Sequence, residues 1–472
     1  MLFNSIEFGF FLPIVFLIYW TIRDTKLKNI FLLAVSYFFY SVWDWRFLFL
    51  IIISSAVDYA IGLALHNEKN QKKRKLLLVA SLSINIGFLA FFKYFNFFIA
   101  TFISTFTFFG SGFSLSPLNI ILPVGISFYT FQTLSYTLDI YNKKISPTKD
   151  IFAFFAFVSF FPQLVAGPIE RAKDLLPQFS APKQNKYSNI RSGFLLIALG
   201  LFKKIVIADR LAIFIDTAYT NTEAASGLPM TFAVIFFAFQ LYLDFSAYSD
   251  MAIGIARILD FKLSTNFKRP YLASSFSDFW SRWHITLSSW FRDYVYIPCG
   301  GNRNGTAKMY RNVLIVFGLS GLWHGASWNF VIWGILNGLF LILIDPILQK
   351  IKGMKILLPL FIFSAWATSL VFFRAATFPE ALSAFSNLGI SNSDTLYNFG
   401  LNSFEFKLAC SLVFANMLLE FIHEKKKNLE VLLLSSPFFI RHAFYLAIVL
   451  SIIFLGSYGS GLNDKNFIYF QF

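Results

Sequence analysis

The stretch NVLIVFGLSGLWHGASWNFVIWGILNGLFLILI, residues 312–344, decides the fold class. It is apolar almost throughout, and it exceeds the roughly 20 residues that a helix needs to cross a bilayer. Its one titratable side chain is His324, within LSGLWHGASWNF. Only helices and closed barrels satisfy their backbone polar groups in lipid, and the alternating pattern of a barrel strand is absent here. The stretch therefore predicts membrane-spanning helix.

The rest of the chain has the same character. Of its 472 residues, 57% are hydrophobic and 14% charged, with a mean hydropathy of +0.62, whereas a soluble chain carries roughly a quarter of charged residues. We predict an all-α polytopic integral membrane protein with about 11 transmembrane helices, the shorter stretches being re-entrant or interfacial. No internal repeat or linker divides it, so one membrane domain over residues 1–472 is expected. The apolar stretches are 8–22, 28–44, 46–65, 76–95, 96–110, 117–136, 151–166, 190–216, 228–258, 312–344, 355–374, 404–422 and 443–458.

The net charge of +15 does not call for nucleic acid as a partner. In a membrane protein, Lys and Arg collect in cytoplasmic loops and contact anionic lipid headgroups. Cys299 and Cys410 lie far apart and form neither a metal-binding pattern nor a disulfide framework. The N-terminal MLFNSIEFGFFLPIVFLIYW has no basic region and no cleavage site, so we expect a retained first span.

Basic residues predict the orientation of the chain in the membrane. The loop NEKNQKKRK, residues 67–75, and the basic run at 425–427 are expected on the cytoplasmic side. Two spans precede the first loop, which puts the N-terminus outside. One span, 443–458, follows the second run and carries the tail GLNDKNFIYFQF, residues 461–472, to the outer side.

The segment SSFSDFWSRWHITLSSWFRDYVYIP, residues 274–298, is amphipathic at helical spacing. It predicts one helix lying in the membrane interface or inside a protein vestibule. His284 falls on the border of its two faces. The apolar face contains Phe276, Phe279, Trp280, Trp283, Leu287, Trp290 and Phe291, and the polar face contains Asp278, Ser281, Arg282, Ser289 and Arg292.

His324 and His284 are the candidate catalytic side chains. A charge in mid-bilayer costs about 2.5–3.5 kcal/mol, whereas a neutral imidazole avoids most of this cost and serves as a base near neutral pH. The alternative is a histidine that only bridges two packed helices. Small neighbours such as Gly321 and Gly325 leave room for a substrate or for close helix packing. Trp323 and Trp328 are candidate walls of a channel, and His66, His423 and His442 are read as ordinary interfacial side chains.

Three acids lie within apolar segments. Asp139, in SYTLDIYNKK, is expected to reach the interface. Asp244 and Asp250, in QLYLDFSAYSDMAIG, have two readings. Either they form structural ion pairs with Arg257, Arg282 or Arg292, or they line a polar path for an acyl donor. No metal-ligand set, phosphate-binding glycine loop or hydrolase nucleophile elbow is present in the sequence.

Several long motifs resemble the membrane-bound O-acyltransferase (MBOAT) family, most closely the membrane subunits of bacterial alginate and peptidoglycan O-acetylation. They occur in the expected order over residues 1–345, with the most specific part at 117–345, whereas 350–460 matches only as apolar spans. The motifs are MLFNSIEF, LPVGISFYTFQTLSYTLDIY, FFPQLVAGPIERAKDLLPQF, LYLDFSAYSDMAIGIARILDF, FKRPYLASSFSDFWSRWHITLSSWFRDYVYIPCGGNR and GLSGLWHGASWNFVIWGILNG.

The resemblance implies that His324 is the catalytic histidine and His284 the second family histidine. It implies a helical bundle in the bacterial cytoplasmic (inner) membrane around a central funnel and tunnel. Acetyl-CoA is then a donor substrate rather than a bound cofactor, and the acyl group leaves on the far side. The expected partners are an SGNH-hydrolase-like extracytoplasmic acetyltransferase and a polysaccharide acceptor. Residues expected along the tunnel and the acyl donor are Asp244, Arg282, Trp283 and Trp323.

The C-terminal FIYFQF resembles an aromatic tail motif of bacterial envelope acyltransferases and of the small partner protein in teichoic-acid D-alanylation. The resemblance implies that Tyr469 accepts the acyl group as an ester, and the alternative is an aromatic membrane anchor. For the whole protein, the other function classes are a transporter or flippase of a lipid-linked precursor, a structural subunit of an envelope assembly, and a lipid or protein O-acyltransferase.

Overall fold

The computed structural model describes residues 1–109, 116–351, 357–425, 429–458 and 467–468. Within these ranges the chain is helical, and it has no β-strand apart from one isolated bridge between Gly227 and Leu388. The all-α prediction is therefore confirmed. The chain divides into two compact units, one of residues 1–190 with 255–264 and one of residues 191–254 with 265–472. A single membrane domain over residues 1–472 stays a prediction.

Four α-helices of the first unit, α1, α2, α4 and α7, begin at side-chain caps. Ser5, Asp24, Asn70 and Asp150 each accept a backbone N–H in the first turn of the helix that follows. Its helices are α1 (Ile6–Thr21), α2 (Thr25–Asp44), η1 (Trp45–Phe47), α3 (Leu48–Asn67), α4 (Gln71–Leu89), η2 (Ala90–Tyr94), α5 (Phe95–Phe108), α6 (Ile126–Tyr141), α7 (Ile151–Ser159) and α8 (Ala172–Ser180).

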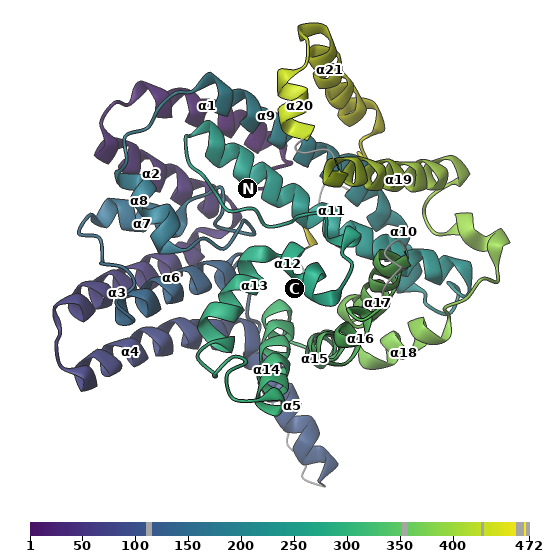
Figure 1. Ribbon diagram of the computed structural model, residues 1–472, viewed down its shortest axis with the longest axis horizontal. Coiled ribbons are helices and arrows are strands. Elements are labelled where there is room, and N and C mark those ends of the chain that lie inside the picture. Colours follow the sequence, from purple (N-terminus) through teal and green to yellow (C-terminus); the bar gives the residue numbers. More distant parts are fainter. Residues whose placement is uncertain (110–115, 352–356, 426–428, 459–466, 469–472) are drawn as a thin grey trace. The chain divides into compact units, whose positions relative to one another are not determined.

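The second unit contains most of the long helix α11 (Figure 1). It also has an aromatic core. α9 begins in the first unit and continues into this one. The helices are α9 (Tyr187–Leu201), η3 (Phe202–Ala208), α10 (Asp209–Thr220), α11 (Leu228–Ile258), η4 (Pro270–Leu272), α12 (Phe276–Arg282), α13 (Ile285–Phe291), η5 (Arg292–Tyr296), α14 (Thr306–His324), α15 (Trp328–Leu339), η6 (Phe340–Ile344), α16 (Asp345–Leu348), α17 (Leu357–Arg374), α18 (Phe378–Ser386), η7 (Ser393–Asn398), α19 (Ser403–Lys425), α20 (Leu429–Ser435) and α21 (Phe438–Leu455).

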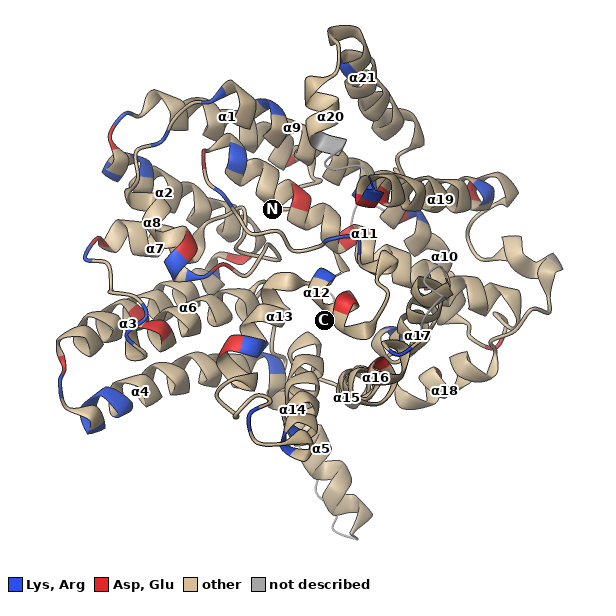
Figure 2. Cartoon of the chain, viewed as in Figure 1, with Lys and Arg blue, Asp and Glu red and all other residues tan. Residues whose placement is uncertain are grey.

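Among the described residues, 7 helical stretches are long and apolar enough to cross a membrane. Figure 2 shows uncharged stretches such as α15 and most of α21. The polytopic membrane prediction is confirmed, and a total of about 11 crossings stays a prediction. The stretches are Thr25–Asn67, Gln71–Phe108, Leu228–Ile258, Trp328–Leu348, Leu357–Arg374, Ser403–Lys425 and Phe438–Leu455.

Three predicted spans were wrong in their extent. The stretch 117–136 becomes helical only at Ile126, after a turn in which Gly125 has φ +77°. The stretch 151–166 leaves the helix after Ser159. The stretch 312–344 is two helices, α14 and α15, joined by the turn Gly325–Ser327. Hydropathy alone does not register these breaks, because the residues at each one are as apolar or as small as their neighbours.

Candidate active site

His324 is the last residue of α14, at the tip of the hairpin that α14 forms with α15. A Cβ atom at Gly321 would overlap the carbonyl oxygen of Phe330, and one at Gly334 would overlap that of Phe317. The backbones therefore touch at these glycines in an antiparallel register. The small residues around His324 serve close helix packing, which was one of the two predicted roles.

His284 lies at a break in the helix that was predicted to be continuous over the segment 274–298. The structure has α12 up to Arg282 and α13 from Ile285, and His284 between them has φ +41° and ψ +54°. The left-handed conformation is costly for a residue with a Cβ atom. The apolar face is otherwise as expected, because Phe276, Phe279, Trp283 and Leu287 are all buried.

His284 is also not a border residue, because its exposed fraction is only 1%. Burial lowers the pKa of its imidazole to about 3, since the charged form loses its hydration. The ring is therefore neutral at physiological pH. A neutral imidazole offers one N–H donor and one basic nitrogen, and its surroundings decide which nitrogen is which.

Asn266 fixes the tautomer of His284. Its side-chain oxygen lies 3.1 Å from His284 Nδ1, and it accepts hydrogen bonds from the hydroxyl and the backbone N–H of Thr286 at 3.0 and 3.4 Å. Its amide nitrogen donates to Ser249 Oγ at 3.3 Å. An oxygen that faces these donors only accepts, so Nδ1 of His284 carries the proton and Nε2 carries the lone pair.

His284 and His324 line the same cavity, whose volume is about 330 Å³. The cavity wall is mainly aromatic and aliphatic, and it includes Trp280 and Trp283. Ser277, Ser288, Ser320 and Arg292 are among its few polar lining residues. An apolar cavity with a few convergent polar groups is the usual form of a small-molecule site.

Aromatic rings hold both imidazoles in place. The Trp323 ring contacts His284 at a centroid distance of 5.9 Å and His324 at 5.0 Å. Trp333 packs edge-on against His324 at 5.1 Å, and Phe245 of α11 packs edge-on against His284 at 4.7 Å. Trp323 thus belongs to the packing around the two histidines, whereas Trp328 is 55% exposed. The role of these two tryptophans as channel walls stays a prediction.

Asp244 and Asp250 form ion pairs with lysines. Asp244 pairs with Lys204 at 2.7 Å, and Lys204 also pairs with Asp209 at 2.9 Å. Asp250 pairs with Lys203 at 2.9 Å. Both acids thus form ion pairs, as one of the two readings expected, but with lysines in place of the expected arginines. A polar path for an acyl donor along these acids stays a prediction. A lysine pair inside the apolar segment LFKKIVIADR was the available sequence signal, since buried charges in such segments require partners.

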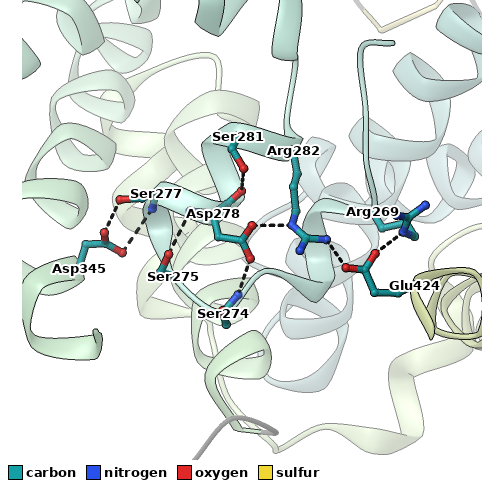
Figure 3. Close-up of polar contacts among 9 residues, drawn as sticks. All are labelled: Arg269, Ser274, Ser275, Ser277, Asp278, Ser281, Arg282, Asp345 and Glu424. Carbon is teal, nitrogen blue, oxygen red and sulfur yellow. Dashed lines mark hydrogen bonds and ion pairs between the residues drawn. The ribbon is translucent and has the colours of Figure 1, made fainter. Parts of the chain in front are cut away.

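Arg282 belongs to a polar network around α12 (Figure 3). Its Nε donates to Asp278 at 2.7 Å, and its Nη1 donates to Glu424 at 3.0 Å. Asp345 accepts the backbone N–H of Phe276 at 2.6 Å, which caps the first turn of α12. Contact of Arg282 with an acyl donor stays a prediction.

Two residues of the C-terminal tail are buried against α11 and η3. The backbone N–H of Ile468 donates to Asp244 at 2.5 Å, and the Phe467 ring lies 4.5 Å from Lys204 Nζ. Tyr469, the predicted acyl acceptor, lies outside the described residues. In the first unit, Asp139 is 2% exposed and pairs with Lys144 at 3.5 Å. Its place at the membrane interface stays a prediction.

Comparison with known proteins gives one consistent result. The model of the family described as "MBOAT, membrane-bound O-acyltransferase family" matches residues 45–373, which include both histidines and their cavity. The chain is 36% identical to a peptidoglycan O-acetyltransferase of Helicobacter pylori, over 86% of this chain and 83% of that protein. It is 39% identical to a probable alginate O-acetylase of Pseudomonas putida, over 72% and 70% respectively. A teichoic acid D-alanyltransferase of Streptococcus thermophilus is 28% identical over 48% of this chain and 58% of its own.

Proposed function

Because the chain belongs to the membrane-bound O-acyltransferase family, we propose that it moves an acetyl group from cytoplasmic acetyl-CoA across the membrane for O-acetylation of an envelope polysaccharide. Its class, a multi-pass membrane O-acyltransferase, is the premise. The acetyl donor and the transfer across the membrane are the proposal. The observation that carries it is one aromatic cavity with two buried histidines on its wall.

His324 acts as the general base. It takes the proton of the attacking hydroxyl while the hydroxyl oxygen bonds to the acetyl carbon. The carbon–sulfur bond of the thioester then breaks, and the departing thiolate takes the proton from the imidazolium. The mainly apolar wall of the cavity excludes water, which limits hydrolysis of the donor.

His284 orients the reactants through its Nε2 lone pair. With the proton on Nδ1, held by Asn266, its Nε2 accepts a hydrogen bond and does not donate one. Orienting a group that carries a polar hydrogen fits this tautomer. Stabilising an oxyanion would require a donor at Nε2.

The C-terminal tail offers a first acceptor for the acetyl group. In this version, the Tyr469 phenol, whose ordinary pKa is about 10, loses its proton to His324 and forms an acetyl ester. The ester then passes its acetyl group to an extracytoplasmic, SGNH-hydrolase-like partner that modifies the polymer. Support comes from the burial of Phe467 and Ile468 against Lys204 and Asp244. Polymer acetylation by a Tyr469→Phe variant at the wild-type level would leave only direct transfer to the glycan hydroxyl.

Orientation in the membrane follows the distribution of Lys and Arg. The N-terminus and the tail then lie outside, and the loop at residues 67–75 lies in the cytoplasm, in a bacterial inner membrane. The acceptor polymer is alginate-like, peptidoglycan or another envelope glycan, in keeping with the names of the relatives.

The test compares ester-linked acetate on purified envelope polysaccharides from wild type and from His324→Ala at matched membrane abundance. Loss of acetate from one polymer supports the proposal and identifies the acceptor. Unchanged acetate on every polymer contradicts it and favours a transporter of a lipid-linked precursor, which needs no base at this position.

A further inference from the structure

The residues on either side of His284 are held by a second stretch of chain. Asn266–Arg269 runs alongside Arg282–Ile285, and the two stretches share two backbone hydrogen bonds. Lys268 N–H donates to the Arg282 carbonyl, and Ile285 N–H donates to the Asn266 carbonyl, both at 2.9 Å. Besides His284, Arg269 also has a left-handed backbone, with φ +49°. Such residues persist only where the surroundings determine them.

Glu424 joins the two stretches at the end away from His284. One of its carboxylate oxygens accepts Arg269 Nε at 2.5 Å, and the other accepts Arg282 Nη1 at 3.0 Å. Figure 3 shows the carboxylate between the two guanidinium groups. The Glu424 side chain therefore binds both stretches, and its contact with Arg282 lies two residues before His284 in the sequence.

The face of α19 that carries Glu424 makes a second contact with the same region. Glu420, one turn earlier, accepts a hydrogen bond from the Tyr242 hydroxyl at 2.7 Å. The Tyr242 ring lies 6.0 Å from the ring of Trp283, the residue before His284. α19 follows residue 373, where the match to the family model ends. The contacts to the histidine segment thus come from a part of the chain outside the matched core.

We propose that Glu424 is a positioning residue, which fixes the orientation of His284 by clamping Arg269 and Arg282 together. The inference rests on the proposed function only in assigning His284 a part in acyl transfer. Its structural half, that Glu424 holds the imidazole in place, stands without that function. The clamping side chains are 20–33% exposed, and ion pairs at this exposure contribute little to folding. The effect of removing Glu424 is therefore expected on geometry rather than on stability.

The experiment uses the full-length protein in detergent or vesicles, with Glu424→Gln as the test variant. Gln has nearly the same shape but lacks the charge that draws both guanidinium groups. Glu405→Gln is the matched control, because Glu405 lies in the first turn of the same helix and accepts a local N–H from Asn402 at 3.2 Å. Both variants lose one negative charge from α19.

Two quantities are measured for each variant. The first is site-resolved acylation of histidines by diethyl pyrocarbonate, quantified by mass spectrometry at His284, His324 and the exposed His442. The second is the turnover of acetyl-CoA. Glu424→Gln is expected to raise modification of His284 several-fold, with His324 and the melting temperature unchanged. It should also lower turnover by about 10- to 100-fold, since small misplacements of a reacting group cost that much.

A double-mutant cycle checks the route of the effect. If the clamp acts through Arg269, the double variant Arg269→Gln/Glu424→Gln should lose much less turnover than the product of the fold-losses in the two single variants. Fully multiplicative losses would contradict the clamp.

The remaining outcomes also decide the question. Unchanged modification of His284 in Glu424→Gln overturns the inference. An equal rise in the modification of His284 and His324, with a lower melting temperature, overturns the inference and shows a general packing role for Glu424. Selective exposure of His284 at full turnover shows that Glu424 does not position a group used in the reaction. The proposed function itself fails separately, if His324→Ala keeps full turnover.

Discussion

Replacing Asn266 by Leu should disable the enzyme through His284 without touching the imidazole itself. Three buried side-chain groups would lose this partner, namely His284 Nδ1, Thr286 Oγ1 and Ser249 Oγ, and so would the backbone N–H of Thr286. Their exposed fractions are 1%, 5% and 2%, so each loss costs at least about 1 kcal/mol and the total approaches ~3 kcal/mol of unfolding free energy. The tautomer of His284 would no longer be fixed.

The activity change should exceed what the lost stability explains. Because the Nε2 lone pair of His284 would no longer be held in one place, we expect kcat to fall about 100-fold, with KM for acetyl-CoA changed much less. The assay is the initial rate of acetyl transfer by protein that is still folded, with thermal unfolding followed in the same detergent.

Thr286→Val is the control for this prediction. It removes one of the four hydrogen bonds of the Asn266 side chain and leaves the bond to His284. It should cost about 1 kcal/mol and keep kcat near the wild-type value. If Asn266→Leu and Thr286→Val have the same kcat, the tautomer argument is refuted.

Gly321→Val should abolish activity and lower the melting temperature, because the valine side chain would overlap the Phe330 carbonyl and force the α14–α15 hairpin apart. A melting temperature near that of wild type would contradict the close backbone contact at this glycine. Protein stability should fall below pH 6.5, by about 2 kcal/mol at pH 5, since the folded pKa of His284 is about 3 and the unfolded chain takes up the proton first. His284→Gln should remove that slope in a pH series of unfolding. Lys204→Met should lower the free energy of unfolding by about 3–5 kcal/mol, because it leaves buried carboxylates without their partner. Adding Asp244→Asn should restore at least half of this loss, as measured by thermal unfolding.

Sequence reasoning predicted the helical membrane class and the two histidines that the cavity brings together. Hydropathy suffices for the membrane class, because it depends on residues close in sequence, whereas the two histidines were chosen from their aromatic and small neighbours and from the family resemblance. The breaks at His284 and at Gly325–Ser327 were missed because hydropathy and periodicity register only such short-range patterns. His284 has a left-handed backbone and hydrogen-bonds to Asn266, a residue 18 positions away that no local pattern connects to it.

The partners of the charged groups were equally inaccessible from local patterns. Asp244 was expected to find an arginine, but it pairs with Lys204 on a different helix. Glu424, at the end of a helix beyond the specific motifs, carried no signal that would connect it to Arg269 and Arg282. Such pairs are set by tertiary packing, which composition and spacing do not encode.

The most direct test of the central claim is acetyl transfer by purified protein in vesicles, with labelled acetyl-CoA as the donor. Wild type, His324→Ala and His442→Ala would be compared at equal protein concentration, after their melting temperatures are shown to be equal. The account predicts that the label leaves CoA with wild type and His442→Ala, and that His324→Ala is slower by at least 100-fold. A His324→Ala rate equal to wild type would contradict the role of this histidine as the base.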